Sequence, residues 1–242
     1  MNKTSRFLAA ILALAFAPAL LLAQQPTAHS AAKIGALAPG ERIVNLDTLK
    51  AQLRKYHECT CACGCYSKDL DLQADRAIAF LRQRAAHRRP QEKLALILDI
   101  DETTLSNYQE MTKADFAYDS KTFNAWVDTA QAPAIAGTLR LTREAQRLGV
   151  SVFFLTGRPE AQRDVTERNL RAQGFQNWQQ LILRSPAQAS ATALAYKSAA
   201  RAGIAAQGYS LVLNVGDQWS DLKGNPEAEF SVKYPDPYYF IR

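Results

Sequence analysis

Four short, continuous apolar runs constrain the fold more than any other feature of this chain. They are Leu94–Leu98, Val150–Leu155, Leu181–Leu183 and Leu211–Leu213. Between them lie stretches with helical character, at about 136–148, 159–173 and 190–202. The glycines expected to close them are Gly149, Gly174 and the pair Gly203 and Gly208. Strands that alternate with helices form βαβ units, whose parallel sheet is buried on both faces. The pattern therefore predicts an α/β fold, with a parallel sheet flanked by helices.

Residues 102–133 interrupt this alternation. The segment separates the first apolar run from the next helical stretch and ends at Pro133, and its aromatic residues are Tyr108, Phe116, Tyr118, Phe123 and Trp126. We interpret it as a small cap inserted after the first core strand. Upstream, residues 44–56 and 67–86 also have helical patterns, and the apolar residues of the second fall on one face. The main domain is expected to span 44–242.

The first 23 residues are predicted to be a signal peptide rather than part of the fold. Lys3 and Arg6 precede the apolar run Phe7–Ala23, as a charged n-region precedes an h-region. The alternative is a single membrane anchor, for which the run is marginal in length. No cysteine follows the run, which disfavours a lipid-anchored protein. We expect a flexible leader over 24–43 and a periplasmic or secreted protein without a stable membrane anchor after cleavage.

The composition excludes several classes of protein. Of the 242 residues, 48% are hydrophobic and 21% are charged, which is unlike collagen-like, low-complexity or disordered chains. The net charge of +6 falls to +4 when Lys3 and Arg6 leave with the predicted signal peptide; this charge mildly favours phosphorylated substrates, but it is too small and scattered to indicate nucleic-acid binding. All four cysteines lie between positions 59 and 65, so a disulfide-scaffolded fold is not expected.

Reactive residues follow the apolar runs, at the edge where open α/β sheets bind ligands. The first run leads into Asp99-Ile100-Asp101. Two carboxylates at this spacing can point the same way, one as a nucleophile and the other as a proton donor. The second run leads into Thr156-Gly157-Arg158, where a hydroxyl and backbone N–H groups before a helix can cradle a phosphate.

The remaining candidates are two acids and a lysine. Asp217 and Asp221 follow the fourth run and offer the hard oxygen ligands that Mg²⁺ prefers, although their spacing also suits the start of a helix. Lys197 lies between the runs and can offset phosphoryl charge. Each motif alone is a weak signal, because most DxD pairs and single lysines are solvated surface. Together, in this order, they indicate a phosphoryl-transfer site.

The order of these motifs resembles the haloacid dehalogenase (HAD) superfamily of phosphatases. The resemblance is closer to subfamily IIIB, the acid phosphatases that include plant acid phosphatases and vegetative storage proteins and are related to bacterial lipoprotein e(P4)-type acid phosphatases. It runs from about residue 45 to the end. The segments that carry it are 64–70, LILDIDETTLSN (96–107), FFLTGRPE (153–160), YKSAAR (196–201), NVGDQWSDL (214–222) and YPDPYYFIR (234–242). It implies a HAD-like Rossmannoid sheet with a cap.

The resemblance also implies a two-step hydrolysis of small-molecule phosphate monoesters. Asp99 would form an aspartyl-phosphate, and Asp101 would protonate the leaving oxygen and then activate water. Thr156, Gly157 and Lys197 would bind the phosphoryl group. Tyr108 follows the catalytic loop most closely, so it is the best candidate for contact with the rest of the substrate. The alternative is that the cap aromatics only form the cap's own core.

The implied cofactor is Mg²⁺. Asp99, the backbone carbonyl of Asp101, and Asp217 would hold it, with Asp221 as a further ligand or as a partner of one. An Asp at position 99 argues against a storage protein that has lost its nucleophile. The alternative function is a non-enzymatic protein on the same fold, either storage-like or metal-binding through the cysteines.

The cysteines form the least typical segment. Cys59, Cys61, Cys63 and Cys65 alternate with other residues beside His57. Local disulfides are one interpretation, with Cys59–Cys65 or Cys59–Cys63 easier than neighbouring pairs, which would be strained in an extended chain. A soft-metal site for Zn²⁺ or Cu(I) and free thiols without a role are the alternatives. The cluster is not placed in the active site.

Overall fold

The computed structural model describes residues 43–61 and 65–241. The predicted signal peptide, nearly all of the predicted leader, and Cys63 lie outside the described residues. Among the helices that are described, none is long and apolar enough to cross a membrane.

The core is a five-stranded sheet in the order β3-β2-β1-β4-β5, and every neighbouring pair is parallel. The strands are β1 (Lys93–Leu98), β2 (Ser151–Pro159), β3 (Gln180–Arg184), β4 (Tyr209–Gly216) and β5 (Phe230–Lys233). The first four contain the four apolar runs, apart from Val150 just before β2, so the predicted α/β sheet is confirmed. The edge strand β5 was not predicted, because its four residues FSVK carry too short and too polar a pattern.

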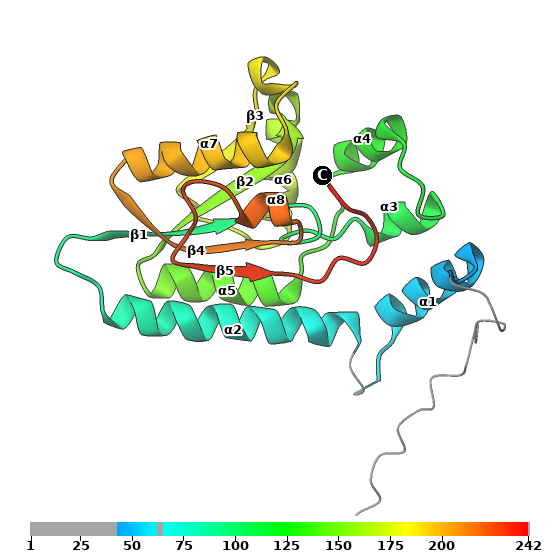
Figure 1. The fold of residues 1–242 in the computed structure, drawn as a ribbon, viewed down its shortest axis with the longest axis horizontal. Coiled ribbons are helices and arrows are strands. Elements are labelled where there is room, and N and C mark those ends of the chain that lie inside the picture. The colour runs from blue at the N-terminus through cyan, green and yellow to red at the C-terminus, as the bar shows by residue number, and fades with distance from the viewer. Residues whose placement is uncertain (1–42, 62–64, 242) are drawn as a thin grey trace, which may run out of the picture. The chain divides into compact units, whose positions relative to one another are not determined.

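Helices cover both faces of the sheet (Figure 1). α2 (Tyr66–Ala86) and α5 (Ala136–Arg147) lie on one face and α7 (Ala193–Ala206) on the other, while α1 (Leu46–Glu58) precedes α2 and α6 (Arg163–Ala172) follows β2. β1 shows why both faces are filled. Its even-numbered leucines pack in the core cluster with α2 and α5, and Ala95 and Ile97 pack in the cluster with α7. Each such leucine contributes about 1.5–3 kcal/mol by burial.

The helices end at the glycines that were predicted to close them, with one exception. Gly149, Gly174 and Gly208 come directly after the C-cap residues of α5, α6 and α7 and have φ angles of 65°, 88° and 84°, which favour glycine. Gly203 was expected to share in closing the last of these helices, but it lies inside α7. The alanine-rich sequence around it carries the helix on to Ala206, because alanine is the best helix former.

The insertion after β1 forms two short helices, α3 (Tyr108–Lys113) and α4 (Ser120–Thr129). The side chain of Asp119 accepts a hydrogen bond from Thr122 N and so caps α4. At the base of the insertion, Ser106 N donates to Pro133 O and Ile135 N donates to Thr104 O, at 2.9 and 3.0 Å. These bonds close the insertion into a unit beside the carboxyl ends of the strands (Figure 1).

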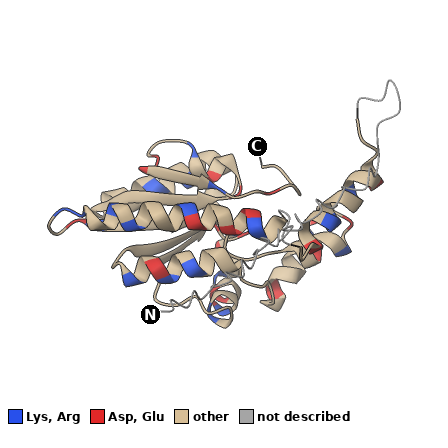
Figure 2. Cartoon of the chain, turned by 90° about the horizontal axis from the view of Figure 1, so that it is seen from below, with Lys and Arg blue, Asp and Glu red and all other residues tan. Residues whose placement is uncertain are grey.

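The outer helices carry mixed charge. Figure 2 shows basic and acidic residues interspersed along the helices on the side it views. Arg140 of α5 pairs with Asp71 and Asp75 of α2, and Arg82 of α2 pairs with Glu144 of α5. These exposed pairs join the two helices, and each contributes at most about 1 kcal/mol.

Candidate active site

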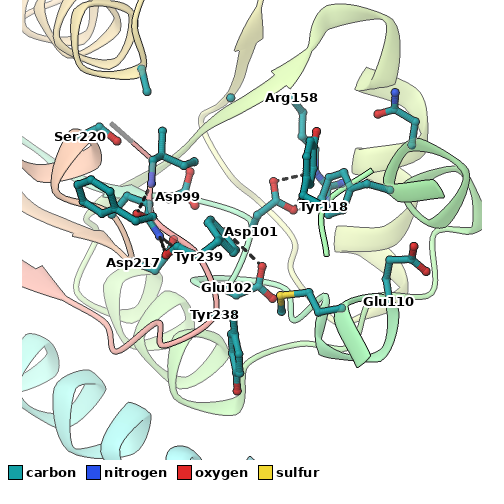
Figure 3. A pocket seen from close by; sticks show the side chains of 18 of the residues that line it. Asp99, Asp101, Glu102, Glu110, Tyr118, Arg158, Asp217, Ser220, Tyr238 and Tyr239 are labelled. Atoms are coloured by element: carbon teal, nitrogen blue, oxygen red, sulfur yellow. Dashed lines mark hydrogen bonds and ion pairs between the residues drawn. The ribbon is translucent and has the colours of Figure 1, made fainter. Parts of the chain in front are cut away.

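The predicted catalytic acids surround one cavity of about 570 Å³ at the carboxyl ends of the strands (Figure 3). Asp99 follows β1 directly, and its backbone N–H donates to Val215 O of β4 at 3.0 Å. Asp217 follows β4, and Lys197 reaches the cavity from α7. The parallel register thus brings together groups that are far apart in the sequence. The predicted site residues that line the cavity are Asp99, Asp101, Gly157, Lys197, Asp217 and Asp221.

Three of these acids form a carboxylate triad, defined here as Asp99, Asp217 and Asp221. They are buried, and one oxygen from each lies within 4.8 Å of the others. Lys197 Nζ donates to Asp99 Oδ1 at 2.5 Å and also to Asp221. Lys197 thus forms ion pairs with two of the three carboxylates of the triad. This buried set of hard oxygen donors fits Mg²⁺, which would neutralise the excess negative charge.

The excess charge perturbs the proton affinities of the triad. Burial raises the pKa of Asp99 to about 7, and the attraction of Lys197 only partly opposes this. Burial, with repulsion from Asp221 and Asp99, raises the pKa of Asp217 well above its usual range. Burial alone would lower the pKa of Lys197, but its two carboxylate partners raise it above the usual value. The lysine therefore stays charged while the acids compete for protons or a metal.

A close approach of two backbone segments places Asp221. It lies in α8 (Trp219–Leu222), where its Oδ2 accepts from Gln218 N at 2.8 Å as half of a capping box. A Cβ at Gly216 would lie 2.4 Å from the Cβ of Asp221, so only glycine fits there. Asp221 thus lies in the first turn of a helix and also lines the cavity with Asp217, and the metal-binding role of the two acids stays a prediction.

Asp217 is held by two neutral donors, which sequence reasoning missed. Thr103 Oγ1 donates to one of its carboxylate oxygens at 3.0 Å, and Gln218 Nε2 donates to the other at 2.7 Å. Gln218 also donates to Asp236 at 2.8 Å and accepts from Ile241 N at 3.0 Å. The C-terminal tail is thereby tied to the triad, and the sole sequence signal was the position of Gln218 beside Asp217.

Asp101 faces a different environment, in which Arg158 is its main partner. The Nη2 atom of Arg158 lies 2.6 Å from Asp101 Oδ1, and its Nε lies 3.2 Å from both carboxylate oxygens. Burial tends to raise the pKa of Asp101, but Arg158 and a hydrogen bond from Asn107 bring it below its usual value. Arg158 was part of the Thr-Gly-Arg motif, yet no role was predicted for it. The pair Asp101–Arg158 balances its own charge.

Two predicted substrate contacts do not line the cavity. Thr156 is fully buried beside it, and its hydroxyl accepts from Arg158 N at 3.1 Å. Tyr108 turns towards α1, where its ring stacks on His57 with centroids 3.4 Å apart and its hydroxyl donates to Glu58 at 2.9 Å. Other aromatic side chains from the cap and the C-terminal tail line the cavity instead: Phe116, Tyr118, Phe123, Tyr238, Tyr239 and Phe240.

The cysteine segment lies outside the lining of this cavity, as far as its residues are described. Cys59 and Cys65 form a disulfide, which is one of the two expected pairings. Cys61 Sγ lies 2.8 Å from Cys59 Sγ and 3.5 Å from Cys65 Sγ. The disulfide joins the end of α1 to the start of α2.

The chain is similar to known acid phosphatases and to plant stem glycoproteins. The family described as HAD superfamily, subfamily IIIB (acid phosphatase), matches residues 20–242. Acid phosphatase 1 of Solanum lycopersicum is 43% identical over 60% of this chain, and the match spans only 58% of that relative's length. The stem 28 kDa glycoprotein of Glycine max is 35% identical over 73% of this chain and 70% of its own.

A solved structure supports the same assignment of the fold. The class C acid phosphatase from Bacillus anthracis superposes with a TM-score of 0.65 at 20% identity, covering 81% of this chain and 86% of that one. Its parallel sheet has the architecture that the motifs predicted here. The family match covers most of the sequence, including every predicted catalytic residue. The chain therefore belongs to the HAD superfamily, subfamily IIIB.

Proposed function

We propose that this protein is an exported, Mg²⁺-dependent acid phosphatase that hydrolyses small phosphate monoesters through an aspartyl-phosphate on Asp99. The arrangement of Asp99 supports this most directly. It lines the cavity beside a lysine and two further carboxylates, and Asp101 lies in the same cavity two residues on. The similarity to acid phosphatases points to the same chemistry.

In the first step, a carboxylate oxygen of Asp99 attacks phosphorus. Lys197 favours the charged form of this carboxylate and offsets the phosphoryl charge. Asp101 gives its proton to the leaving oxygen. Arg158 lowers the pKa of Asp101 in the free site, and the negative charge of an incoming phosphate raises it again. Thr156, whose hydroxyl still has its own proton to donate, and Gly157 are proposed to bind the phosphoryl oxygens.

In the second step, water attacks the aspartyl-phosphate. Asp101 has lost its proton by then, and Arg158 stabilises it as the carboxylate that accepts a proton from the water. Asp99 is regenerated when phosphate leaves. When bound, Mg²⁺ would neutralise charge on the phosphoryl oxygens; Asp99 and Asp217 would hold it, with the carbonyl of Asp101 and Asp221 as further candidates.

Export is the part of the proposal that only the sequence supports. Lys3, Arg6 and the apolar run to Ala23 have the order of a signal peptide. Expression of the full chain, followed by N-terminal sequencing of protein from the exported fraction, tests this. We expect a mature chain that begins at Gln24, and a retained Met1 in the membrane fraction would contradict it.

The activity is tested with p-nitrophenyl phosphate and the purified protein. We expect hydrolysis that EDTA abolishes, that Mg²⁺ restores and that Asp99→Asn removes. Asp75→Asn on the surface of α2 serves as the matched control and should leave the rate unchanged. Activity that survives Asp99→Asn would contradict the nucleophile, and activity that survives EDTA would contradict the metal.

A further inference from the structure

We propose that Asn107 is a positioning residue for Asp101, and that it connects the cap helix α4 to this acid–base carboxylate. The inference rests on the proposed function, because it assigns a purpose to the surroundings of Asp101. Asn107 lies at the start of α3 and is fully buried. It does not line the cavity, so it acts through Asp101 rather than on the substrate.

Every polar atom of the Asn107 side chain has a partner. Its Nδ2 donates to Asp101 Oδ1 at 2.9 Å and to Glu102 Oε2 at 3.0 Å. Its Oδ1 accepts from Trp126 Nε1 at 2.9 Å. The amide has only one workable orientation, since the reverse would place its oxygen against two carboxylate groups and its NH₂ against an indole N–H. No other neutral side chain of this size offers two donors and an acceptor in this arrangement.

The turn from Glu102 to Asn107 brings the Asn107 side chain back to Asp101. Glu102 has a φ angle of 55°, which is unfavourable for a residue with a side chain. Hydrogen bonds maintain this conformation: Glu102 N donates to Leu105 O at 2.8 Å, and Asn107 N donates to Glu102 Oε1 at 2.5 Å. Glu102 is itself almost fully buried. The turn thus uses a buried acid to fix the asparagine.

Asn107 and Arg158 hold Asp101 from two different parts of the chain. Both donate to Oδ1 at less than 3 Å, whereas Oδ2 receives only Nε of Arg158 at 3.2 Å. An arginine alone would allow the carboxylate to turn with it. The second donor fixes the rotation and leaves Oδ2 as the oxygen available for proton transfer, which depends on a positioned donor.

The third contact of Asn107 leads to the cap. Trp126 is a buried residue of α4, and Phe123 and Asn124 of the same helix line the cavity. A shift of α4 on substrate binding would therefore reach Asp101 through Trp126 and Asn107. Binding of the leaving group against the cap would in this way change the position of the Asp101 carboxylate.

The test uses Asn107→Asp and compares two substrates. The variant keeps the shape and the acceptor for Trp126 but replaces the NH₂ group with a carboxylate oxygen, which repels Asp101 and Glu102 instead of donating to them. An aryl phosphate has a good leaving group and needs little protonation, whereas an alkyl phosphate depends on the general acid. Since kcat/KM reports only the steps up to departure of the leaving group, we expect a loss of roughly 100-fold for the alkyl phosphate and under about 10-fold for p-nitrophenyl phosphate.

A second, milder variant keeps the test independent of folding. Trp126→Phe removes only the indole N–H, and it should lower kcat/KM for the alkyl phosphate a few-fold more than for the aryl phosphate. Trp178→Phe is the matched control, because Trp178 packs on Phe154 away from the cavity, and it should not alter the ratio. Equal losses for both substrates, or no loss, in folded Asn107→Asp or Trp126→Phe would overturn the inference. Absence of hydrolysis by the wild-type protein would instead contradict the proposed function.

Discussion

The two sides of the cavity hold their carboxylates in opposite ways (Figure 3). On one side, Lys197 pairs with two of the three acids of the carboxylate triad, and burial raises the pKa of Asp99 to about 7. On the other side, Asp101 is paired with Arg158, and the pKa of Asp101 lies below its usual value. Residues only two positions apart on one loop thus have opposite shifts.

The difference shows on which side the protein's own residues neutralise the carboxylate charge. Around Asp101, the protein supplies the opposite charge and the hydrogen bonds itself. In the triad it leaves negative charge uncompensated, which is costly in a buried place unless protons or a cation bind. The triad is therefore the side at which an external cation changes the molecule, and the Asp101 side is the one at which the protein's own contacts matter.

The largest expected effect separates the two sides by their response to Mg²⁺. Asp217→Asn and Asp101→Asn should each lower kcat/KM for an alkyl phosphate by at least about 100-fold. Because Asp217 is a proposed Mg²⁺ ligand, raising the Mg²⁺ concentration should restore part of the activity of the Asp217→Asn variant. Asp101→Asn retains the backbone carbonyl and loses only the proton donor, so Mg²⁺ should not restore it. Steady-state rates over a Mg²⁺ titration check this, and equal rescue of both variants would remove the distinction.

The second prediction concerns the stability of the triad. Because the folded pKa of Asp99 is raised to about 7, its contribution to the free energy of unfolding is fully present below about pH 4 and is lost as the pH rises through 7. Mg²⁺ competes with these protons, so it should stabilise the protein more at pH 8 than at pH 5. At 100 times its Kd we expect about 3 kcal/mol.

Urea unfolding at both pH values, with and without Mg²⁺, measures this stabilisation. Asp217→Asn serves as the control and should show a smaller gain at the same Mg²⁺ concentration. A gain that is equal at pH 5 and pH 8 would mean that Mg²⁺ does not compete with the protons of the triad.

The two sides also differ in how far the sequence predicted them. Asp99 and Asp217 directly follow buried strands, so the parallel register alone brings them together. The partners of Asp101 come from elsewhere: Arg158 lies near the end of β2, and Asn107 follows a turn with an unusual φ angle at Glu102. Tyr108 was expected in the cavity, but its direction depends on contacts with His57 and Glu58 about fifty residues upstream. Contacts between side chains so far apart in the sequence leave no local pattern from which they could be predicted.

The third prediction tests the packing that places Asp221. Gly216→Ala puts a Cβ within 2.4 Å of the Asp221 side chain and should destabilise the protein by about 2 kcal/mol, since backbone and helix α8 must move apart. The response to Mg²⁺ should weaken with it. Gly203→Ala is the matched control: its Cβ meets nothing within 4 Å and lies inside α7, so it should stabilise by about 0.5–1 kcal/mol. Urea unfolding compares the two, and a neutral Gly216→Ala would contradict the close approach.

The smallest effect should come from His57, whose pH dependence has the opposite sign to that of the triad. Burial between aromatic rings lowers its pKa to about 4. Its contribution to the free energy of unfolding is present above pH 6.5 and is lost as the pH falls through 4, whereas Asp99 contributes most at low pH. Since His57 is partly exposed, we expect only about 1–2 kcal/mol.

His57→Gln should remove this loss, so that the variant loses less stability than the wild type between pH 6.5 and pH 4. Its ring also contacts Tyr238, which lines the cavity from the tail, so the measurement is made by urea unfolding rather than by activity. The exposed His87→Gln is the matched control and should follow the wild type. If His57→Gln and the wild type declined in parallel, the acid-side loss would arise from other groups, such as Glu144, whose pKa is lowered by Arg147 and Arg82, and His57 would not contribute the opposite pH dependence.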